Sequence, residues 1–214
     1  MEISKEILTV EGQTDRMSVP SGSEAPKIGT KLVQRGLCTS QALIRALAEQ
    51  KELAAQGMYA PVGQILVRQK SLSQDELRKV VQDIQLEALS KVRLFQSLSA
   101  ADLSSLLDKC EAICFPDQTL LAQEGEKAEA FYVIVAGTVR IYRVSRQGLE
   151  VDLNVLGPGE GFGEMGLLDG AFRTSNVRTI GSAHLIRIFE PHFKDLLQSR
   201  HEVFNTLQIG RAHV

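Results

Sequence analysis

One stretch of the chain, residues 157–177, contains the residue types that bind a phosphorylated sugar. It reads GPGEGFGEMGLLDGAFRTSNV, with a glycine at every second position from 157 to 163. Glycine lets the backbone turn and approach a ligand with no side chain between them. Glu164 can accept hydrogen bonds from hydroxyl groups, and Arg173 carries a fixed cationic fork that suits phosphate oxygens. The spacing therefore favours a ligand that has both a hydroxyl and a phosphate group.

The residues around this pair add to the same chemistry. EMGLLD is a candidate for one helical turn whose free amides would point back toward the glycines, and Thr174 and Ser175 add hydroxyl groups beside the arginine. A cyclic nucleotide satisfies all of these features together. An ion pair between Glu164 and Arg173 without any ligand is the alternative, but it leaves the alternating glycines unexplained.

The elements that must position this stretch are mostly strands. Many short β-type runs with glycine at the turns predict a small barrel or sandwich. A helical pattern runs into the first strand, and helical spacing returns after the last one. The segments concerned are 94–115, then the β-type runs 119–126, 130–144, 146–160, 172–180 and 183–190, and finally the helical 191–208.

Residues 94–208 resemble a cyclic-nucleotide-binding domain of the catabolite-activator and protein-kinase regulatory-subunit type. The resemblance rests on the LFQSLSAADL helix, the turn at Glu124–Glu126, FYVIVAGTVRIY, GPGEGFGE and the RTS triplet. It implies an eight-stranded jelly roll with flanking helices, in which residues 162–176 form the phosphate-binding cassette. The departures are Asp117, where the family often has glycine, and Asn176, behind the cassette.

The resemblance also implies the ligand contacts. Glu164 would take the ribose 2′-hydroxyl and Arg173 the cyclic phosphate, with backbone groups of Gly163 and Met165 and the hydroxyls of the RTS triplet around it. The expected ligand-binding residues are Phe162, Gly163, Glu164, Met165, Arg173, Thr174 and Ser175. Bacterial relatives usually bind cAMP, so the resemblance implies cAMP as the ligand. The alternative is cGMP, because relatives that prefer cGMP often carry a threonine at the position of Thr174.

The N-terminal part contains an internal repeat with a period of 34 residues. Gly29 falls on Gly63, Thr39 on Ser73, and the apolar Leu43 on Leu77. Each copy reads as a short helix, a turn and a longer helix, with Thr39 and Ser73 as N-caps. The two apolar stripes should pack together, because neither helix pair can bury its own stripe alone. Residues 1–26, rich in Gly, Ser and Pro, are expected to form a flexible leader.

The repeat resembles the N-terminal domain of type II secretion ATPases of the MshE kind, over residues 27–85 of an expected domain 27–90. The first copy keeps the Gly, Leu-Val and Leu-x-x-x-Leu-x-x-Gln spacing, with Lys27 in place of the leading arginine. The second copy has Pro61 at that position. In that family, intact copies bind cyclic di-GMP through the arginine, so binding of cyclic di-GMP is not expected here. We expect instead a helical module that interacts with another protein.

Composition bounds the remaining possibilities. The chain has 214 residues, a net charge of −2, 43% hydrophobic and 23% charged residues, which are ordinary globular values. No apolar run is long enough for a membrane helix, and the start lacks the order of a signal peptide. Three cysteines cannot form a complete disulfide framework, and no metal-ligand pattern accompanies them. A cytoplasmic protein without metal or membrane contact is expected.

The expected fold is α+β: a small all-α helical repeat domain followed by a β jelly-roll barrel with flanking helices. The expected function is a non-enzymatic sensor that couples ligand occupancy at 91–208 to helix rearrangement. Two alternatives stay open, a metal-dependent enzyme on a cupin-like barrel and an adaptor whose barrel has no ligand. The four histidines, His184, His192, His201 and His213, are scattered, which gives the enzyme little support.

The end of the chain has an unusual composition. Residues 209–214, IGRAHV, look like translated sequencing-adapter DNA, so we expect a non-native tail and a natural chain that continues past Gln208. The trailing helix is expected to allow a homodimer. No recognition helix is visible, so nucleic-acid binding is not expected from this fragment.

Overall fold

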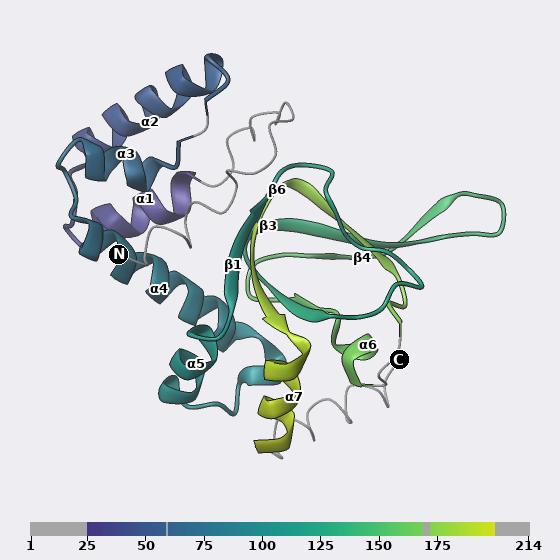
Figure 1. Ribbon diagram of the computed structural model, residues 1–214. Coiled ribbons are helices and arrows are strands. Elements are labelled where there is room, and N and C mark those ends of the chain that lie inside the picture. The colour runs from purple at the N-terminus through teal and green to yellow at the C-terminus, as the bar shows by residue number, and fades with distance from the viewer. Residues whose placement is uncertain (1–24, 59, 169–171, 200–214) are drawn as a thin grey trace. The chain divides into compact units, whose positions relative to one another are not determined.

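The computed structural model describes residues 25–58, 60–168 and 172–199 (Figure 1). The described residues fall into two compact units that divide between Ile84 and Gln85. The sequence pattern predicts a domain boundary at residue 90, whereas the two units divide within one continuous helix, residues Gln74–Lys91. The predicted leader, residues 1–26, lies almost entirely outside the described residues, and the first helix begins at Ala25. The predicted tail, residues 209–214, lies outside them as well.

The first unit consists of two helical hairpins. Its helices are α1 (Ala25–Gln34), α2 (Ser40–Ala55), α3 (Val62–Arg68) and the first part of α4 (Gln74–Lys91). Leu32 and Leu66, which are 34 positions apart, are both fully buried in one apolar cluster. The helices therefore bury their apolar faces against one another, as the repeat required.

The two hairpins end and begin their helices in the same way. The Gly36 amide donates to the Val33 carbonyl at 2.9 Å, and the Lys70 amide donates to the Val67 carbonyl at the same distance. Both residues have positive φ, 67° for Gly36 and 55° for Lys70. Thr39 Oγ1 caps α2 by accepting from the Ala42 amide at 3.1 Å. The predicted turn chemistry is present in both copies.

The second helix of each hairpin packs closely on the first. A Cβ atom at Gly29 would lie within 3.0 Å of the Leu43 side chain, and one at Gly63 would lie equally close to Leu77. These two glycine–leucine contacts are separated by the repeat period. The hairpins also exchange polar contacts, because Arg35 pairs with Asp83 while Gln69 Nε2 donates to Glu49 Oε2 at 2.6 Å. Positions 35 and 69, like 49 and 83, are equivalent, so the exchange is reciprocal.

Lys70→Gly is expected to raise the free energy of unfolding by about 1 kcal/mol. The left-handed conformation costs a non-glycine residue roughly 1 to 2 kcal/mol, and glycine avoids this cost at the end of a helix. The matched control is Gly36→Lys, which should lower the free energy of unfolding by a similar amount. Urea unfolding followed by circular dichroism measures both. Shifts of the same sign in the two variants would contradict this explanation.

The second unit begins with helices and continues with strands. Its elements are the last part of α4, η1 (Arg93–Phe95), α5 (Ala100–Leu107), β1 (Glu111–Phe115), β2 (Leu120–Ala122), β3 (Ala130–Val144), β4 (Glu150–Leu156), β5 (Gly161–Phe162), α6 (Glu164–Leu168), β6 (Asn176–Phe189) and α7 (Glu190–Ser199). Ser99 and Asp102 form a capping box at the start of α5. This is the predicted α+β arrangement, a jelly-roll-like antiparallel sheet with flanking helices.

The sheet has six strands among the described residues, where the resemblance implied eight. Its main order is β1-β6-β3-β4, with β2 paired to β6 and β5 paired to β3, all antiparallel. The pairing of β3 with β6 shifts register between Ile134 and Ala136 and again before Thr138. Register shifts bend a strand without ending its pairing. Two long bent strands therefore replace several shorter ones.

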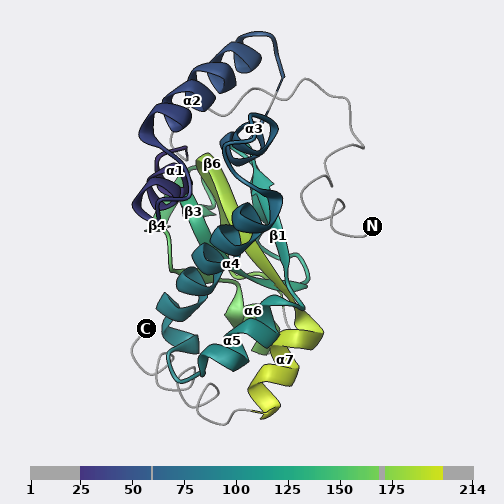
Figure 2. The same ribbon diagram turned by 90° about the vertical axis from the view of Figure 1, so that its left-hand side faces the viewer.

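Alternate side chains of β3 enter two different cores. Phe131 and Val133 belong to a cluster with the helices, and Tyr132 and Ile134 belong to the cluster enclosed by the sheet. In the first cluster Phe131 stacks on Phe193 of α7, with 5.1 Å between the ring centroids. Both views show α5 and α7 side by side at one end of the sheet (Figure 1, Figure 2). The second cluster lines the inside of the barrel, next to the glycine-rich stretch.

None of the helices among the described residues has both the length and the apolar composition that crossing a membrane requires.

Candidate functional site

The glycine-rich stretch forms a short strand, a short helix and a return to the sheet. Strand β5 pairs Gly161 and Phe162 with β3, and α6 begins immediately afterwards at Glu164. Residues 169–171 lie outside the described part. The chain then runs through residues 172–176, which we call the arginine segment, into β6. Glu164 is thus the first residue of α6, and Arg173 follows α6 in the chain; the two residues lie at the same end of the barrel.

The Arg173 side chain is buried, with 9% of its surface exposed. Its Nη2 donates to the Ala130 carbonyl at 2.7 Å, and its Nη1 donates to the Gly163 carbonyl at 3.2 Å. Burial lowers the pKa of the guanidinium, while Tyr132 and the carboxylates of Glu129 and Glu164 act to raise it. Both of these acceptors are neutral carbonyls, so an anion is the natural further partner for this buried charge.

Gly163 lets the backbone pass directly against this arginine. Its φ is +99°, a conformation that side chains disfavour. A Cβ atom at this position would lie within 3.0 Å of Arg173 Nη1, closer than real Cβ atoms approach other groups. Only a glycine leaves room for the guanidinium here. Of the alternating glycines in the sequence, this one has a direct role in the site.

The Glu164 carboxylate lies at the start of α6 and is half-buried. Burial raises its pKa, whereas hydrogen bonds from the Glu164 and Gly163 amides and the charge of Arg173 lower it. The sequence predicted that amides at this turn would be free for an anion. The amides of Glu164 and Gly163 act on the pKa of the Glu164 carboxylate, and binding of an anion by the amides of α6 stays a prediction. The carboxylate and the guanidinium are nevertheless close enough to interact electrostatically, as the spacing predicted.

Tyr132 and Phe162 form the wall beside the arginine. Their rings stack with 5.1 Å between centroids and an interplanar angle of 15°. The guanidinium of Arg173 lies 5.8 Å from the centroid of the Tyr132 ring, within the range of a cation–π contact. The side chain of Phe162, with 4% of the residue exposed, is therefore part of the core. Sequence reasoning missed Tyr132, because nothing in a strand pattern separates it from other core aromatics.

The turn at Glu124–Glu126 holds the backbone of the arginine segment. The Arg173 amide donates to the Glu126 carbonyl at 2.7 Å, and the Gly125 amide donates to the Arg173 carbonyl at 2.9 Å. A further bridge joins Lys127 and Phe172. The turn and the arginine, which are nearly fifty positions apart, thus form one small ladder. The turn motif seen in the sequence has a supporting role in the site.

Asn176 connects this turn to the sheet. Its Oδ1 accepts from the Glu124 amide at 3.0 Å, and its Nδ2 donates to the Tyr142 carbonyl at 3.5 Å. The residue is 7% exposed. Asn176, which departs from the family pattern, therefore connects the arginine segment to the turn and to β3. Signals for this role were absent from the sequence, since both partners are distant in the chain.

The other predicted site residues lie around the same centre. Met165 has 39% of its surface exposed, Thr174 is exposed and Ser175 is half-buried. The structure brings Gly163, Glu164 and Arg173 together, and the ligand contacts of the seven residues stay a prediction. No group of three or more His, Cys, Asp or Glu side chains that could hold a metal ion occurs among the residues described.

A family model described as "Cyclic nucleotide-binding domain" matches residues 112–200. The chain is 27% identical over 121 residues to a "CRP-like cAMP-activated global transcriptional regulator" from Mycobacterium tuberculosis, a match that covers 56% of this chain and 54% of that protein. The chain spans about half the length of the curated relatives it matches.

Two solved structures have a similar fold. Thermus thermophilus catabolite activator protein superposes with a TM-score of 0.53 and 28% identity, covering 56% of each chain. The regulatory domain of Toxoplasma gondii PKA, solved with cAMP, gives a TM-score of 0.52 and 26% identity, covering 54% of this chain and 44% of that one. The family match and the shared fold support the same type of domain. Residues 112–200 therefore form a domain of the cyclic nucleotide-binding family.

Proposed function

We propose that the barrel binds a cyclic mononucleotide, with cAMP as the ligand, and that the chain acts as a regulatory sensor and not as an enzyme. The observation that carries this proposal is the meeting of Arg173 and Glu164 at Gly163. A buried guanidinium with neutral partners suits a phosphodiester, and a carboxylate beside it suits a ribose hydroxyl. The names of the relatives, which include a cAMP-activated regulator and a cAMP-dependent kinase regulatory subunit, support the choice of cAMP.

Each predicted residue has a part in this binding mode. Arg173 would hold the cyclic phosphate, and Glu164 would accept a hydrogen bond from the 2′-hydroxyl. Thr174 and Ser175 would add hydroxyl groups around the phosphate, and Gly163 and Met165 would offer backbone groups. With cGMP the same sugar and phosphate contacts would form, so a preference for cAMP would have to come from contacts with the base.

We propose that occupancy is transmitted through α7. Phe193 of α7 stacks on Phe131, and the next residue of β3 is Tyr132, whose ring faces Arg173. A change at the phosphate site can therefore reach the helix through adjacent residues of one strand. Transmission requires that the ligand bind one helix arrangement more tightly than another. A homodimer through the trailing helix is part of this proposal, and its residues past Ser199 lie outside the described part.

For the helical repeat unit we propose a role in binding a protein partner. Its resemblance to the MshE-type domain stays a prediction, and the side chain of Lys27, at the leading position, lies outside the described part. Pro61 begins the second copy without any charged group. Cyclic di-GMP therefore serves as the contrasting ligand in the test below.

Thermal unfolding in the presence of cAMP, cGMP or cyclic di-GMP tests the proposal. Ligand at a hundred times its dissociation constant should stabilise the native state by about 2.7 kcal/mol, seen as a rise in melting temperature. We expect this rise with cAMP, a smaller one with cGMP and none with cyclic di-GMP. The absence of a rise with either mononucleotide would refute the proposed function. A rise with cyclic di-GMP would assign a ligand to the helical repeat unit.

A further inference from the structure

Arg143, at the end of β3, makes a direct contact with the arginine segment. Its Nε donates to the Thr174 carbonyl at 2.7 Å, across 31 positions of sequence. The same Nε lies 3.5 Å from Glu124 Oε1. Glu124 is also the residue whose amide donates to Asn176. Arg143 therefore joins the sheet to both the turn and the segment that follows the phosphate-binding arginine.

The turn at Glu124–Glu126 and strand β3 provide hydrogen-bond partners for the polar groups of the arginine segment described above. The amide and carbonyl of Arg173 are held by the turn, and the Asn176 side chain by the turn and by β3. The carbonyl of Thr174 lies between these two anchor points, and Arg143 supplies its donor. Without that donor, the carbonyl of the peptide between Thr174 and Ser175 loses the partner that fixes its orientation, and the positions of the Thr174 and Ser175 hydroxyls are less restricted.

The contact lies on the binding side of the sheet and outside the core. Side chains alternate along a strand, so Arg143 lies on the same side as Ile141, which packs against the cluster inside the barrel. The Arg143 side chain is 52% exposed. An exposed arginine contributes little to the stability of a core. Its contact with a single carbonyl of the binding segment points to a role in ligand binding.

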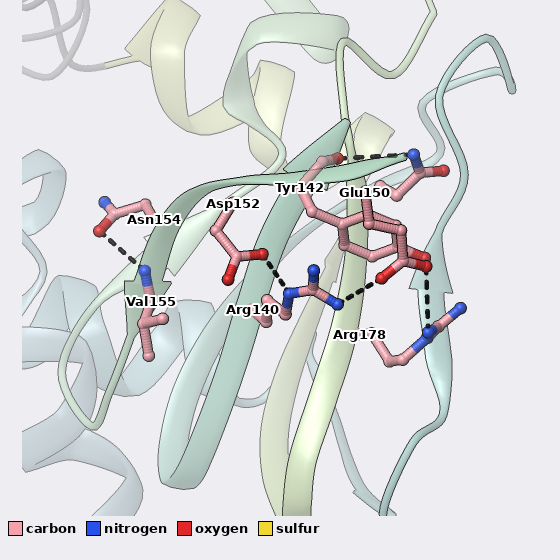
Figure 3. A network of polar contacts seen from close by, with 8 residues as sticks. Arg140, Tyr142, Glu150, Asp152, Asn154, Val155 and Arg178 are labelled. Atoms are coloured by element: carbon pink, nitrogen blue, oxygen red, sulfur yellow. Dashed lines mark hydrogen bonds and ion pairs between the residues drawn. The ribbon is translucent and has the colours of Figure 1, made fainter. Parts of the chain in front are cut away.

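Arg140 of the same strand provides a comparison. It lies on the opposite side of the sheet, between Asp152 and Glu150, and Glu150 in turn contacts Arg178 (Figure 3). Its guanidinium lies 4.6 Å from the centroid of the Tyr142 ring. Arg140 thus has more ionic partners than Arg143, and these partners lie on β4 and not in the arginine segment. Arg140 therefore has its contacts within the sheet, whereas Arg143 contacts the binding segment.

We propose that Arg143 is a positioning residue for cyclic nucleotide binding, acting through the hydrogen bond from its Nε to the Thr174 carbonyl. This inference rests on the proposed function, because the segment it holds is the one assigned to the phosphate. The hydrogen bond fixes the peptide between Thr174 and Ser175 in the orientation that the bound phosphate needs. The positive charge of Arg143 is not the property that matters.

Three substitutions separate the donor from the charge. In Arg143→Gln the amide nitrogen takes the place of Nε along the side chain, so the donor remains and the charge is lost. In Arg143→Lys a methylene takes that place, so the charge remains and the donor is lost. Arg143→Met loses both. We expect Gln to bind cAMP within about twofold of the original chain, and Lys and Met to bind about tenfold more weakly, the factor that corresponds to about 1.4 kcal/mol.

Isothermal titration with cAMP on the whole chain measures these affinities, with Arg140→Met as the matched control. The control should bind as the original chain does, and melting temperatures without ligand should be unchanged in the Arg143 variants. Binding restored by Lys but not by Gln would mean that the charge acts on the ligand, and would overturn the inference. Unchanged affinity in all three variants would overturn it as well. Failure of the original chain to bind cAMP or cGMP would instead refute the proposed function and remove this role with it.

Discussion

Arg173→Ala should weaken cAMP binding by about a hundredfold or more. Hydrogen bonds to a charged group contribute roughly 1.5 to 3 kcal/mol each, and a guanidinium fork can make two of them to a phosphate. Each loss of about 1.4 kcal/mol corresponds to a tenfold change in affinity. Arg173→Lys keeps the charge but not the fork, so its affinity should fall between the two. Titration calorimetry with cAMP measures the series.

The loss should be specific to this arginine. Arg178 lies five positions further along the chain, and its guanidinium lies 5.1 Å from the Tyr142 ring, beside Glu150. Arg178→Ala is therefore the control and should leave the affinity unchanged. Arg173→Ala also leaves the carbonyls of Ala130 and Gly163 without their donor, so the melting temperature without ligand should fall moderately. Binding of cAMP by Arg173→Ala at the original affinity would exclude Arg173 from the site.

Gly163→Ala should reduce cAMP binding as strongly as the loss of Arg173 itself. The new methyl group would lie within 3.0 Å of Arg173 Nη1, and 3.1 Å from the Ala130 carbonyl oxygen. Both the guanidinium and the carbonyl that holds it would have to move. The positive φ of +99° adds a backbone cost of about 1 to 2 kcal/mol. Titration with cAMP and thermal unfolding measure the two effects separately.

A second glycine isolates the effect on the arginine. Gly148 has a similar φ of +81°, but a Cβ atom there would meet no heavy atom within 4 Å. Gly148→Ala should therefore carry a comparable backbone cost and keep its affinity for cAMP. Equal losses of affinity in the two variants would show that backbone strain, and not displacement of Arg173, explains the result.

The helical hairpins were predictable because their signals are local. Thr39 caps the helix that follows it, and Gly36 ends the helix before it, each through contacts a few positions away. The exchange of Arg35 and Gln69 between hairpins was not predictable in the same way. This exchange depends on which helix faces pack against each other. A periodic pattern shows which face of each helix is apolar, but it does not show which helix that face contacts.

The same division holds for the site. Gly163, Glu164 and Arg173 lie within one short stretch, so their types and spacing were enough to place them together. Tyr132, Arg143 and Asn176 contact the stretch from distant strands or depend on distant partners, and a sequence pattern gives such residues no distinguishing mark. The strand count differed for a related reason. Register shifts within the pairing of β3 and β6 depend on hydrogen bonds between segments, which periodicity along one segment cannot reveal.

Strand β3 contacts Arg173 near one of its ends and the arginine segment near the other. Its first residue, Ala130, receives Arg173 Nη2 through its carbonyl, and Arg143, next to its last residue, holds Thr174. Inserting or deleting a single residue between these two points would turn Arg143 to the other face while Ala130 stayed in place. Tolerated changes in length should therefore fall in the turn from Ser145 to Leu149, which lies past both points of attachment.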